Sequence, residues 1–268
     1  MPKPIAVQLY SIRESIKENG FPGPLKRIAD IGYKAVEPAG FFNVRPGELR
    51  KMVEDLGMTI CSSHSPWAKP ENLSECMDFA CLLGLDTIVC GYGPDAFKTL
   101  DDIKATTEKT SKMAEVAARN GFTLFQHNHY WEFERIDGRL KYDIYRELCP
   151  AVKYEIDCFW STNKGQEDAV AMLREFAKDT ILLHMKDGVC RQVAKNDGMK
   201  DGLLDMKIDL MPLGTGDLPI PALVAEAPAA VKAVVVELDY CSEEMFGALE
   251  KSYRYMVGNG ICEGNRTI

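Results

Sequence analysis

Histidine, tryptophan and long apolar runs are scarce in this sequence of 268 residues. It contains four histidines and three tryptophans. No uninterrupted apolar run is long enough to span a bilayer, and the first residues lack the apolar core and the cleavage site of a secretory signal. We therefore expect a soluble, cytoplasmic protein that does not bind membranes.

Positive charge is also in deficit, because the formal net charge is -8 at pH 7 and the sequence pI is near 5.2. A protein that binds nucleic acid by neutralising many phosphates needs the opposite balance, so nucleic acid is not an expected partner. An enzyme with one small basic cleft is compatible with this charge. The nine cysteines are scattered and include no C-x-x-C pair, which is typical of reduced thiols in a cytosolic protein.

Short apolar segments rich in β-branched residues recur along the chain and alternate with segments of helical spacing. Regular alternation of this kind is typical of repeated β-strand and α-helix units with buried parallel strands. Several expected strands follow a glycine suited to end the preceding helix, as in DIGY, DLGM, LLGLD and ARNGF. The eight expected strands cover residues 5–10, 34–39, 59–64, 87–92, 122–127, 152–157, 181–186 and 233–238.

Eight such units in a chain of this length predict a (β/α)8 TIM barrel that forms a single domain over residues 1–268. The alternative is an open doubly wound sheet, which normally carries a glycine-rich phosphate loop after its first strand. That position reads QLYSIRESIKENG and contains no G-x-G-x-x-G. The long segment from Gly188 to Pro219 is rich in Gly, Asp and Lys, and we expect it to form a partly mobile active-site loop over the barrel mouth.

All four histidines fall at or near the C-terminal ends of expected strands. His64 closes the third strand, His127 and His129 mark the end of the fifth, and His184 lies near the end of the seventh. TIM-barrel enzymes carry their active sites at these strand ends. A single histidine in such a position is more often a hydrogen-bonded core residue, but four of them at one rim predict a functional site.

Carboxylates occur at the same rim. Glu37 lies on the second expected strand, Asp157 closes the sixth, Glu237 lies on the eighth, and Glu132 follows the fifth. A carboxylate within an apolar strand is costly to bury unless it is paired or binds a metal, and a basic neighbour alone would explain Glu37. Together with the imidazoles, these carboxylates predict a site for one divalent metal ion; Mn, Co, Zn and Mg all suit mixed oxygen and nitrogen ligands.

An ordered set of motifs resembles a known family. The motifs are VQLYSIRE, GYKAVEPAG, SSHSP, FQHNHYWEFE, EIDCFW, LLHMKDG, PLGTGD and VVVELD. They resemble the sugar phosphate isomerase/epimerase family of xylose-isomerase-like TIM barrels, a group that includes inosose dehydratases, hydroxypyruvate isomerases and ketose 3-epimerases. The resemblance covers nearly the whole chain, but one barrel supports many chemistries, so it says less about the substrate.

The resemblance implies a metal held by Glu, Asp, His and Glu from strands five to eight. Asp157 in EIDCFW, His184 in LLHMKDG and Glu237 in VVVELD match three of these ligands. For the fourth, epimerase-like members carry a glutamate within strand five, near where this chain has Gln126. Members with an HNH motif carry it a few residues later, here Glu132.

Glu132 is therefore the expected fourth ligand, and His127 or His129 is the alternative. The expected reaction is that of a divalent-metal-dependent sugar isomerase or epimerase, which abstracts a proton next to a carbonyl through a metal-stabilised enediolate. Glu132 and Glu237 are the expected bases on opposite sides of the sugar. Proton return to the adjacent carbon gives isomerisation, and return to the other face gives epimerisation.

Other side chains are expected to bind the sugar. Hydroxyl binding or proton donation is expected from His64, His127, His129 and Lys186, with an ion pair to Asp187 as the alternative role of Lys186. Glu37, Trp67 and Trp160 are the expected substrate-binding residues, although simple packing would also explain the tryptophans. The turn LGTGD, residues 213–217, is a weak signal for a phosphate site and does not by itself predict a phosphorylated substrate.

Alternative functions follow from the same residues. Expulsion of a β-hydroxyl or β-alkoxy group would make the protein a dehydratase or lyase of the inosose dehydratase or 3-keto-glycoside eliminase type, which the histidine-rich HNH stretch favours. A barrel that only binds sugar is the alternative of another class. A hydrolase of the endonuclease IV type needs a multi-metal centre and a basic DNA track, which four histidines and a net charge of -8 disfavour. The expected partner is a small sugar or keto-sugar, and association into a homo-oligomer is left open.

Overall fold

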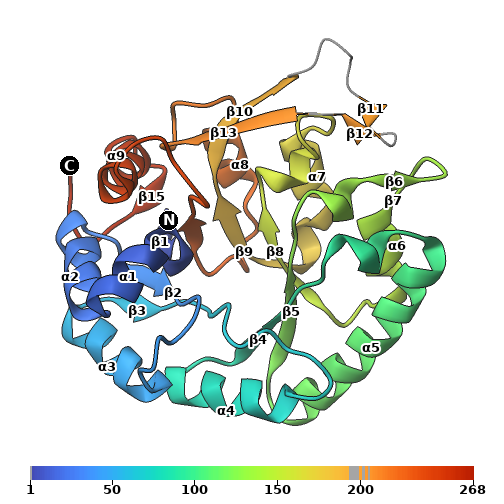
Figure 1. Ribbon diagram of the computed structural model, residues 1–268, viewed down its shortest axis with the longest axis horizontal. Helices are drawn as coiled ribbons and strands as arrows, with labels where there is room; N and C mark the ends of the chain where they lie inside the picture. The colour runs from blue at the N-terminus through green and yellow to red at the C-terminus, as the bar shows by residue number, and fades with distance from the viewer. Residues whose placement is uncertain (1, 193–198, 201–202, 205) are drawn as a thin grey trace.

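Eight parallel strands curl around a common axis at the centre of the protein, and the helices lie outside them (Figure 1). The structure is a computed structural model that describes residues 2–192, 199–200, 203–204 and 206–268. The strands are hydrogen-bonded in the order β3-β2-β1-β14-β9-β8-β5-β4, which is their chain order read around a ring. The predicted (β/α)8 barrel is confirmed. The strands are β1 (Lys3–Gln8), β2 (Ala35–Glu37), β3 (Thr59–Ile60), β4 (Thr87–Cys90), β5 (Thr123–His127), β8 (Lys153–Asp157), β9 (Thr180–Met185) and β14 (Val234–Val236).

The expected strands exist at all eight positions, but most end before the predicted segment does. β3 is the shortest and covers only Thr59 and Ile60 of the predicted 59–64. Beyond it the chain leaves the regular ladder, although the backbone N–H of His64 still donates to the Pro38 carbonyl over 2.8 Å. The segment after β3 also reaches β4, because the N–H of Ala68 donates to the carbonyl of Val89 over 2.8 Å. The polar residues that follow Ile60, His64 among them, therefore belong to the connection at the barrel mouth.

Local sequence signals fix where the helices begin and end. At α5, Thr99 and Asp102 form a capping box, and α4 ends at Gly84, whose φ of 76° suits a residue without a side chain. No helix in the described part of the chain is both long and apolar enough to cross a membrane. The α-helices are α1 (Arg13–Asn19), α2 (Pro22–Ile31), α3 (Pro46–Asp55), α4 (Leu73–Leu83), α5 (Leu100–Arg119), α6 (Lys141–Leu148), α7 (Ala169–Phe176), α8 (Ile220–Glu226) and α9 (Met245–Gly258). Short 3-10 helices are η1 (Leu9–Ile12), η2 (Pro94–Phe97), η3 (Trp131–Phe133), η4 (Trp160–Thr162) and η5 (Ala177–Asp179).

The core has two parts. The larger part lies between the strands and the helices, and a smaller cluster fills the inside of the barrel. The residues of this barrel floor are at most 3 % exposed: Ala6, Ala35, Val89, Phe125, Leu182, Ala233 and Val235. Because these side chains point inward, the residues that follow them on the same strand faces are placed inside the barrel mouth.

The segment between β9 and α8 is not simply a loop. β10 (Asp187–Gln192) and β13 (Met206–Met211) pair as an antiparallel ribbon, which lies at the periphery of the ring in Figure 1. Tyr240, after β14, donates its hydroxyl to the Ile208 carbonyl over 2.5 Å and ties the ribbon to the barrel. The predicted active-site loop over 188–219 falls partly on residues 193–198, 201–202 and 205, which lie outside the described residues. The remaining short strands are β6 (Arg135–Ile136), β7 (Arg139–Leu140), β11 (Met199–Lys200), β12 (Leu203–Leu204) and β15 (Cys262–Glu263).

Candidate active site

The site begins where the apolar barrel floor gives way to polar side chains. On five strands, the residue two positions after a floor residue is polar and faces the same interior, because side chains alternate along a strand. These five residues are at most 5 % exposed, so they form a polar layer directly above the floor. The pairs of floor and polar residue are Ala6 and Gln8, Ala35 and Glu37, Phe125 and His127, Leu182 and His184, and Val235 and Glu237.

Glu155, on β8, lies at the centre of three imidazoles. His64 Nε2 is 2.6 Å from Glu155 Oε2, and His127 Nδ1 is 3.3 Å from the same oxygen. His184 Nε2 lies 3.3 Å from Glu155 Oε1. The rings of His64 and His184 stack, with centroids 5.0 Å apart. One buried carboxylate therefore hydrogen-bonds the imidazole of His64 and lies within 3.3 Å of two further imidazoles, those of His127 and His184.

Glu37 is the second carboxylate of the polar layer. It accepts hydrogen bonds from Gln8 Nε2 over 2.5 Å, from His184 Nε2 over 2.7 Å, and from the Ser62 hydroxyl. His64 Nε2 is 3.3 Å away. These bonds compensate the burial of Glu37, so its place in an apolar strand is explained by polar and imidazole partners inside the barrel.

Lys186 joins the carboxylates nearer the mouth. Its Nζ donates to Asp157 Oδ2 over 2.6 Å and to Glu237 Oε2, and it lies 3.7 Å from Asp239 Oδ2. His184 Nδ1 lies 2.9 Å from Glu237 Oε2. The ion pair of Lys186 with its neighbour in sequence is not formed, because successive residues of an extended chain face opposite ways and Lys186 points into the barrel.

The buried charges divide the histidines into two kinds. Burial opposes protonation of His184, but the charges of Glu155, Glu37 and Glu237 outweigh it and raise the pKa of His184 well above its usual value. Burial dominates at His127 and lowers its pKa well below the usual value. His127 is therefore neutral near pH 7, and one of its ring nitrogens carries a free lone pair.

Two overlapping groups of side chains offer the donors that a divalent ion needs. Within each group, the ligand atoms all lie within 4.8 Å of one another. His127 Nδ1 and Glu155 Oε1 are buried and have no hydrogen-bond partner, which is costly in the absence of a ligand. The residues therefore fit a divalent cation. The groups are His64, His127, Glu155 and His184, and His127, Asp157, His184 and Glu237.

The second group contains three of the expected metal ligands, and Glu132 is in neither group. Glu132 is buried after β5, where its Oε2 accepts from the His129 backbone N–H over 2.9 Å. The side chain of Glu132 lies close to that of Gln126. Because successive residues of a strand face opposite sides and His127 faces the barrel interior, Gln126 faces the outside of β5. The fourth donor beside the other three is an imidazole, that of His127.

Replacing Glu132 by glutamine should change how stability depends on pH. Burial raises the pKa of Glu132 from 4.5 to about 8, so folding favours its neutral form. The stability from this preference is complete below pH 4.5 and is lost as the pH rises through about 8. In urea titrations with EDTA, we expect the wild type to lose about 3–5 kcal/mol relative to Glu132→Gln between pH 5 and pH 9. In the exposed control Glu48→Gln, the free energy of unfolding should depend on pH as it does in the wild type. The same pH dependence in Glu132→Gln as in the wild type would contradict the raised pKa of Glu132.

A cavity of about 200 Å³ opens directly over these residues. Trp67 and Trp160 supply flat apolar walls, and Gly91 makes room for the first, since a Cβ there would lie 2.3 Å from the Trp67 ring. His129 stacks on Trp131 with ring centroids 4.3 Å apart. Burial, together with the charge of Lys186, lowers the pKa of His129 to about 4. The full lining is Tyr10, Ala39, His64, Trp67, His127, His129, Trp160, Lys186, Glu237 and Asp239.

Several residues of the site were not anticipated from the sequence. Glu155 stands two residues before Asp157 in EIDCFW, so strand alternation places both on one face and was the available signal. The same rule applies to Asp239, two residues after Glu237. Gln8 and Ser62 carried no comparable signal, because neutral polar residues at strand ends are common.

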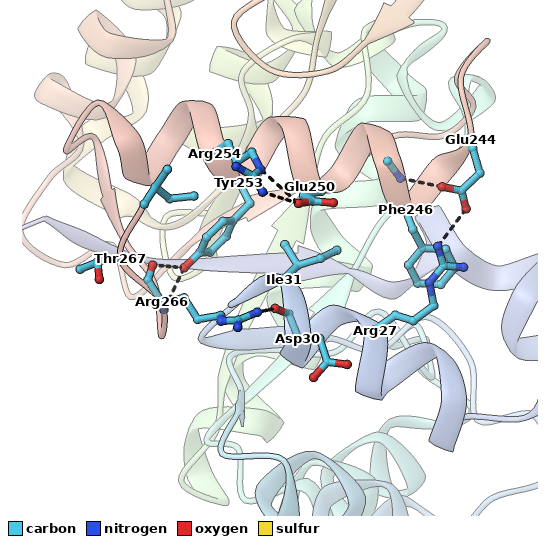
Figure 2. Close-up of a pocket in the computed structure, with 12 residues that line it drawn as sticks. Arg27, Asp30, Ile31, Glu244, Phe246, Glu250, Tyr253, Arg254, Arg266 and Thr267 are labelled. Atoms are coloured by element: carbon cyan, nitrogen blue, oxygen red, sulfur yellow. Dashed lines mark hydrogen bonds and ion pairs between the residues drawn. The ribbon is translucent and has the colours of Figure 1, made fainter.

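A larger groove of about 620 Å³ lies elsewhere, between α2, α9 and the C-terminal residues (Figure 2). Its charged side chains bind one another across the groove or along α9: Arg27 lies 3.4 Å from Glu244, and Arg254 donates to Glu250 over 2.8 Å. It contains none of the histidines. The smaller cavity is therefore the candidate active site, because it alone of the two is lined by buried acids, imidazoles and indoles.

Comparison with known proteins places the chain among barrels of this architecture. The family model described as xylose isomerase-like TIM barrel matches residues 25–244. No curated protein is significantly similar in sequence. A sugar phosphate isomerase/epimerase from Parabacteroides distasonis has a TM-score of 0.76 and 21 % identity, covering 97 % of this chain and 100 % of that one.

Two further solved structures are similar at lower identity. An L-ribulose 3-epimerase has a TM-score of 0.66 and 17 % identity, covering 97 % of this chain and 96 % of the epimerase. A probable 3-DHS dehydratase from Bacillus anthracis has a TM-score of 0.69 and 11 % identity, covering 94 % of this chain and 98 % of the dehydratase. At these identities the likeness is one of fold.

Proposed function

This chain belongs to the family of xylose isomerase-like TIM barrels, and from that membership we propose that it is a divalent-metal-dependent sugar isomerase or epimerase. One observation carries the proposal: His127, Asp157, His184 and Glu237 bring their donor atoms within 4.8 Å of one another beside the aromatic-walled cavity. Residues from four separate strand ends converge there. A barrel that only bound sugar would have no need of buried carboxylates in such number.

These four residues would hold the metal, with His127 taking the place expected of Glu132. Two carboxylate oxygens and two imidazole nitrogens suit Mn, Co, Zn or Mg. When bound, such an ion is a Lewis acid that polarises the carbonyl and hydroxyl oxygens of a sugar. Glu37 binds the imidazole of His184 and would hold it in one orientation, as carboxylates commonly do for histidine ligands, and Glu155 lies 3.3 Å from the imidazole of His127.

The proton-transfer groups of the proposed reaction line the cavity. Glu237 is the proposed base, because it lines the cavity and is held in place by Lys186 and His184. His64, His129 and Lys186 are the proposed hydroxyl binders and proton donors. Glu132 does not line the cavity, and we assign it the support of His129 through the backbone. Trp67 and Trp160 would cover the C–H faces of the sugar.

A dehydratase or lyase is the second candidate. The observation that favours it is the density of proton donors around the cavity, since a leaving hydroxyl must be protonated as the C–O bond breaks. The likeness in fold to a probable dehydratase is compatible with this alternative. Both reactions begin with the same proton abstraction, so the same residues serve either outcome.

Deuterium exchange tests the shared first step. Wild-type protein with added Mn should transfer deuterium from D2O to the carbon next to the carbonyl of at least one substrate among keto-sugars, inososes and 3-keto-glycosides. Glu237→Gln should slow this exchange about 10²–10⁴-fold, the usual contribution of a general base. Mass spectrometry and NMR identify the labelled product and distinguish isomerisation, epimerisation and elimination.

The controls separate an enzyme from a binding protein. Glu48→Gln, on the exposed surface, should exchange at the wild-type rate. EDTA should stop the exchange. A protein that retains no stoichiometric ion, ignores EDTA and exchanges no substrate would contradict the proposal and favour a barrel that only binds sugar.

A further inference from the structure

Asn128, the asparagine between the two histidines of the HNH motif, is fully buried but takes no part in the proposed proton transfer. It is the first residue after β5, and its side-chain amide reaches the end of β8. Its Oδ1 accepts a hydrogen bond from the backbone N–H of Asp157 over 2.9 Å, and its Nδ2 donates to the Asp157 carbonyl over 3.3 Å. Nδ2 also donates to the His129 carbonyl over 3.2 Å. One side chain therefore binds both backbone groups of a proposed metal ligand.

The amide of Asn128 takes the place of a backbone partner between two strands. The ladder of β5 and β8 ends with the pairing of His127 and Glu155. Past that point the asparagine side chain supplies the donor and the acceptor that a peptide group would offer to Asp157. Aspartate has the same shape but no donor when it is ionised, and leucine has neither group. The residue type is therefore matched to this contact.

The carboxylate of Asp157 extends this contact to a wall of the cavity. Its Oδ1 accepts from the backbone N–H of Phe159 over 3.0 Å and from that of Trp160 over 2.8 Å. Its Oδ2 accepts from Lys186 Nζ over 2.6 Å. The two oxygens thus have different partners, and Oδ1 holds the turn that carries Trp160. Because Trp160 lines the cavity, the position of Asp157 also sets the position of one indole wall.

The main chain of Asn128 carries two further residues of the site. His127, a proposed ligand, precedes it, and His129, which lines the cavity, follows it. Both backbone groups of His129 are bound: its N–H donates to Glu132 over 2.9 Å, and its carbonyl accepts from Asn128 over 3.2 Å. Loss of the Asn128 amide would therefore disturb the histidine turn as well as Asp157.

We infer that Asn128 is a positioning residue of the active site, whose amide holds Asp157, and through it the indole of Trp160, in place relative to the histidines on either side. This inference rests on the proposed function for the role of Asp157 as a metal ligand. It also gives the asparagine of the HNH motif a physical role, since this residue joins the strand end that provides His127 to the strand end that provides Asp157.

The affinity for Mn tests the inference without any substrate. Metal-free protein is titrated with Mn, and the EPR signal of the free ion gives the Kd, with circular dichroism to follow folding. We expect Asn128→Ala to bind Mn about 10–100-fold more weakly than the wild type, the usual effect of losing a residue that orients a metal ligand. Unchanged affinity in folded Asn128→Ala would overturn the inference.

The matched control is Asn72→Ala. Asn72 also binds two backbone groups at the barrel mouth, since it accepts from the N–H of Lys69 over 2.7 Å and donates to the carbonyl of Trp67 over 3.0 Å. It contacts no proposed ligand, so Asn72→Ala should bind Mn as the wild type does. An equal loss of affinity in both variants would show a general effect of the lost hydrogen bonds and would count against positioning by Asn128.

Asp157→Asn separates this inference from the proposed function. Weaker Mn binding in Asp157→Asn but not in folded Asn128→Ala would keep Asp157 as a ligand and overturn the role of Asn128. Unchanged Mn binding in both variants would contradict the ligand set of the proposed function, and the inference would fall with it. Weaker binding in both variants is the expected result.

Deuterium exchange into substrate distinguishes positioning from direct catalysis. Asn128 does not line the cavity, so its loss should act through the metal ligand. The exchange rate of Asn128→Ala should fall at limiting Mn and should recover toward the wild-type rate when Mn and substrate are saturating. A loss of rate that persists at saturating Mn, with unchanged Mn affinity, would overturn the inference.

Amide hydrogen exchange in the wild type keeps the inference testable if Asn128→Ala does not fold. Followed by mass spectrometry, exchange should slow on addition of Mn both in residues 127–130 and in residues 157–160, because the Asn128 amide joins the two segments. Slowing confined to one of the two segments would show that they are not coupled and would overturn the inference.

Discussion

Replacing His184 by alanine is expected to abolish retention of a divalent ion and to lower kcat/KM on the order of 10³-fold or more. His184 is the one histidine whose two ring nitrogens each lie within hydrogen-bonding distance of a different carboxylate: Nδ1 lies 2.9 Å from Glu237, and Nε2 lies 2.7 Å from Glu37. Its loss removes a proposed ligand and also frees the carboxylates that it orients. Metal analysis of the purified protein and deuterium exchange measure the two effects.

Folding must be followed in parallel, because the same substitution leaves buried carboxylates without their imidazole partner. Breaking a buried ion pair costs about 3–5 kcal/mol, so circular dichroism and urea titration accompany the metal analysis. His184→Gln is the milder variant, since its amide still donates a hydrogen bond but is a poor ligand. Asp86→Asn, in the exposed pair with Lys232, is the matched control. Full metal occupancy in folded His184→Ala would remove His184 from the ligand set.

Replacing Lys186 by methionine is expected to destabilise the metal-free protein by about 3–5 kcal/mol, and a divalent ion should restore most of the loss. The lysine is 1 % exposed and lies against Asp157, Glu237 and Asp239. Without it, these acids face one another with no compensating charge from that side. Urea titrations in EDTA and in excess Mn measure both parts of the effect.

The control for Lys186→Met is Lys153→Met. Lys153 pairs with Asp179 near the surface, so its loss should cost no more than about 1 kcal/mol and should not depend on Mn. Equal stability of Lys186→Met and wild type in EDTA would contradict the charge balance described for the site. A loss that Mn does not reduce would show that the ion does not bind among these carboxylates.

The architecture could be predicted from the sequence because each strand is a compact apolar run between turn signals. The strand ends were less predictable. Thr59 to His64 looked like one strand, yet only Thr59 and Ile60 stay in the ladder, since the polar residues that follow turn toward the barrel mouth. Hydrophobic periodicity describes burial, and inward-facing polar residues of a barrel are buried without being apolar.

The site could be predicted for residues on strands, because the position of a residue along a strand determines the side to which its side chain points. Asp157, His184 and Glu237 lie at strand ends and meet, as their equivalent positions implied. Glu132 lies five residues past the end of β5. The two-residue alternation of side chains applies only within a strand and does not predict the path of the turn that follows it. The position of Glu132 on the outer side of β5 was therefore not foreseeable. The partners of Lys186 were equally hidden, because they come from β8 and from the segment after β14.

The apolar plug beneath the polar layer makes the chamber single-ended. Phe125, Leu182 and Val235 close the cavity at its base. Ligands therefore enter and leave through the same opening, which is bordered by the indoles of Trp67 and Trp160. Whatever binds deepest must enter first and leave last. A sugar bound beside Trp67 and Trp160 would cover the histidines. The metal ion would then have to bind before the sugar, and it would be shielded from chelators for as long as the sugar stays bound.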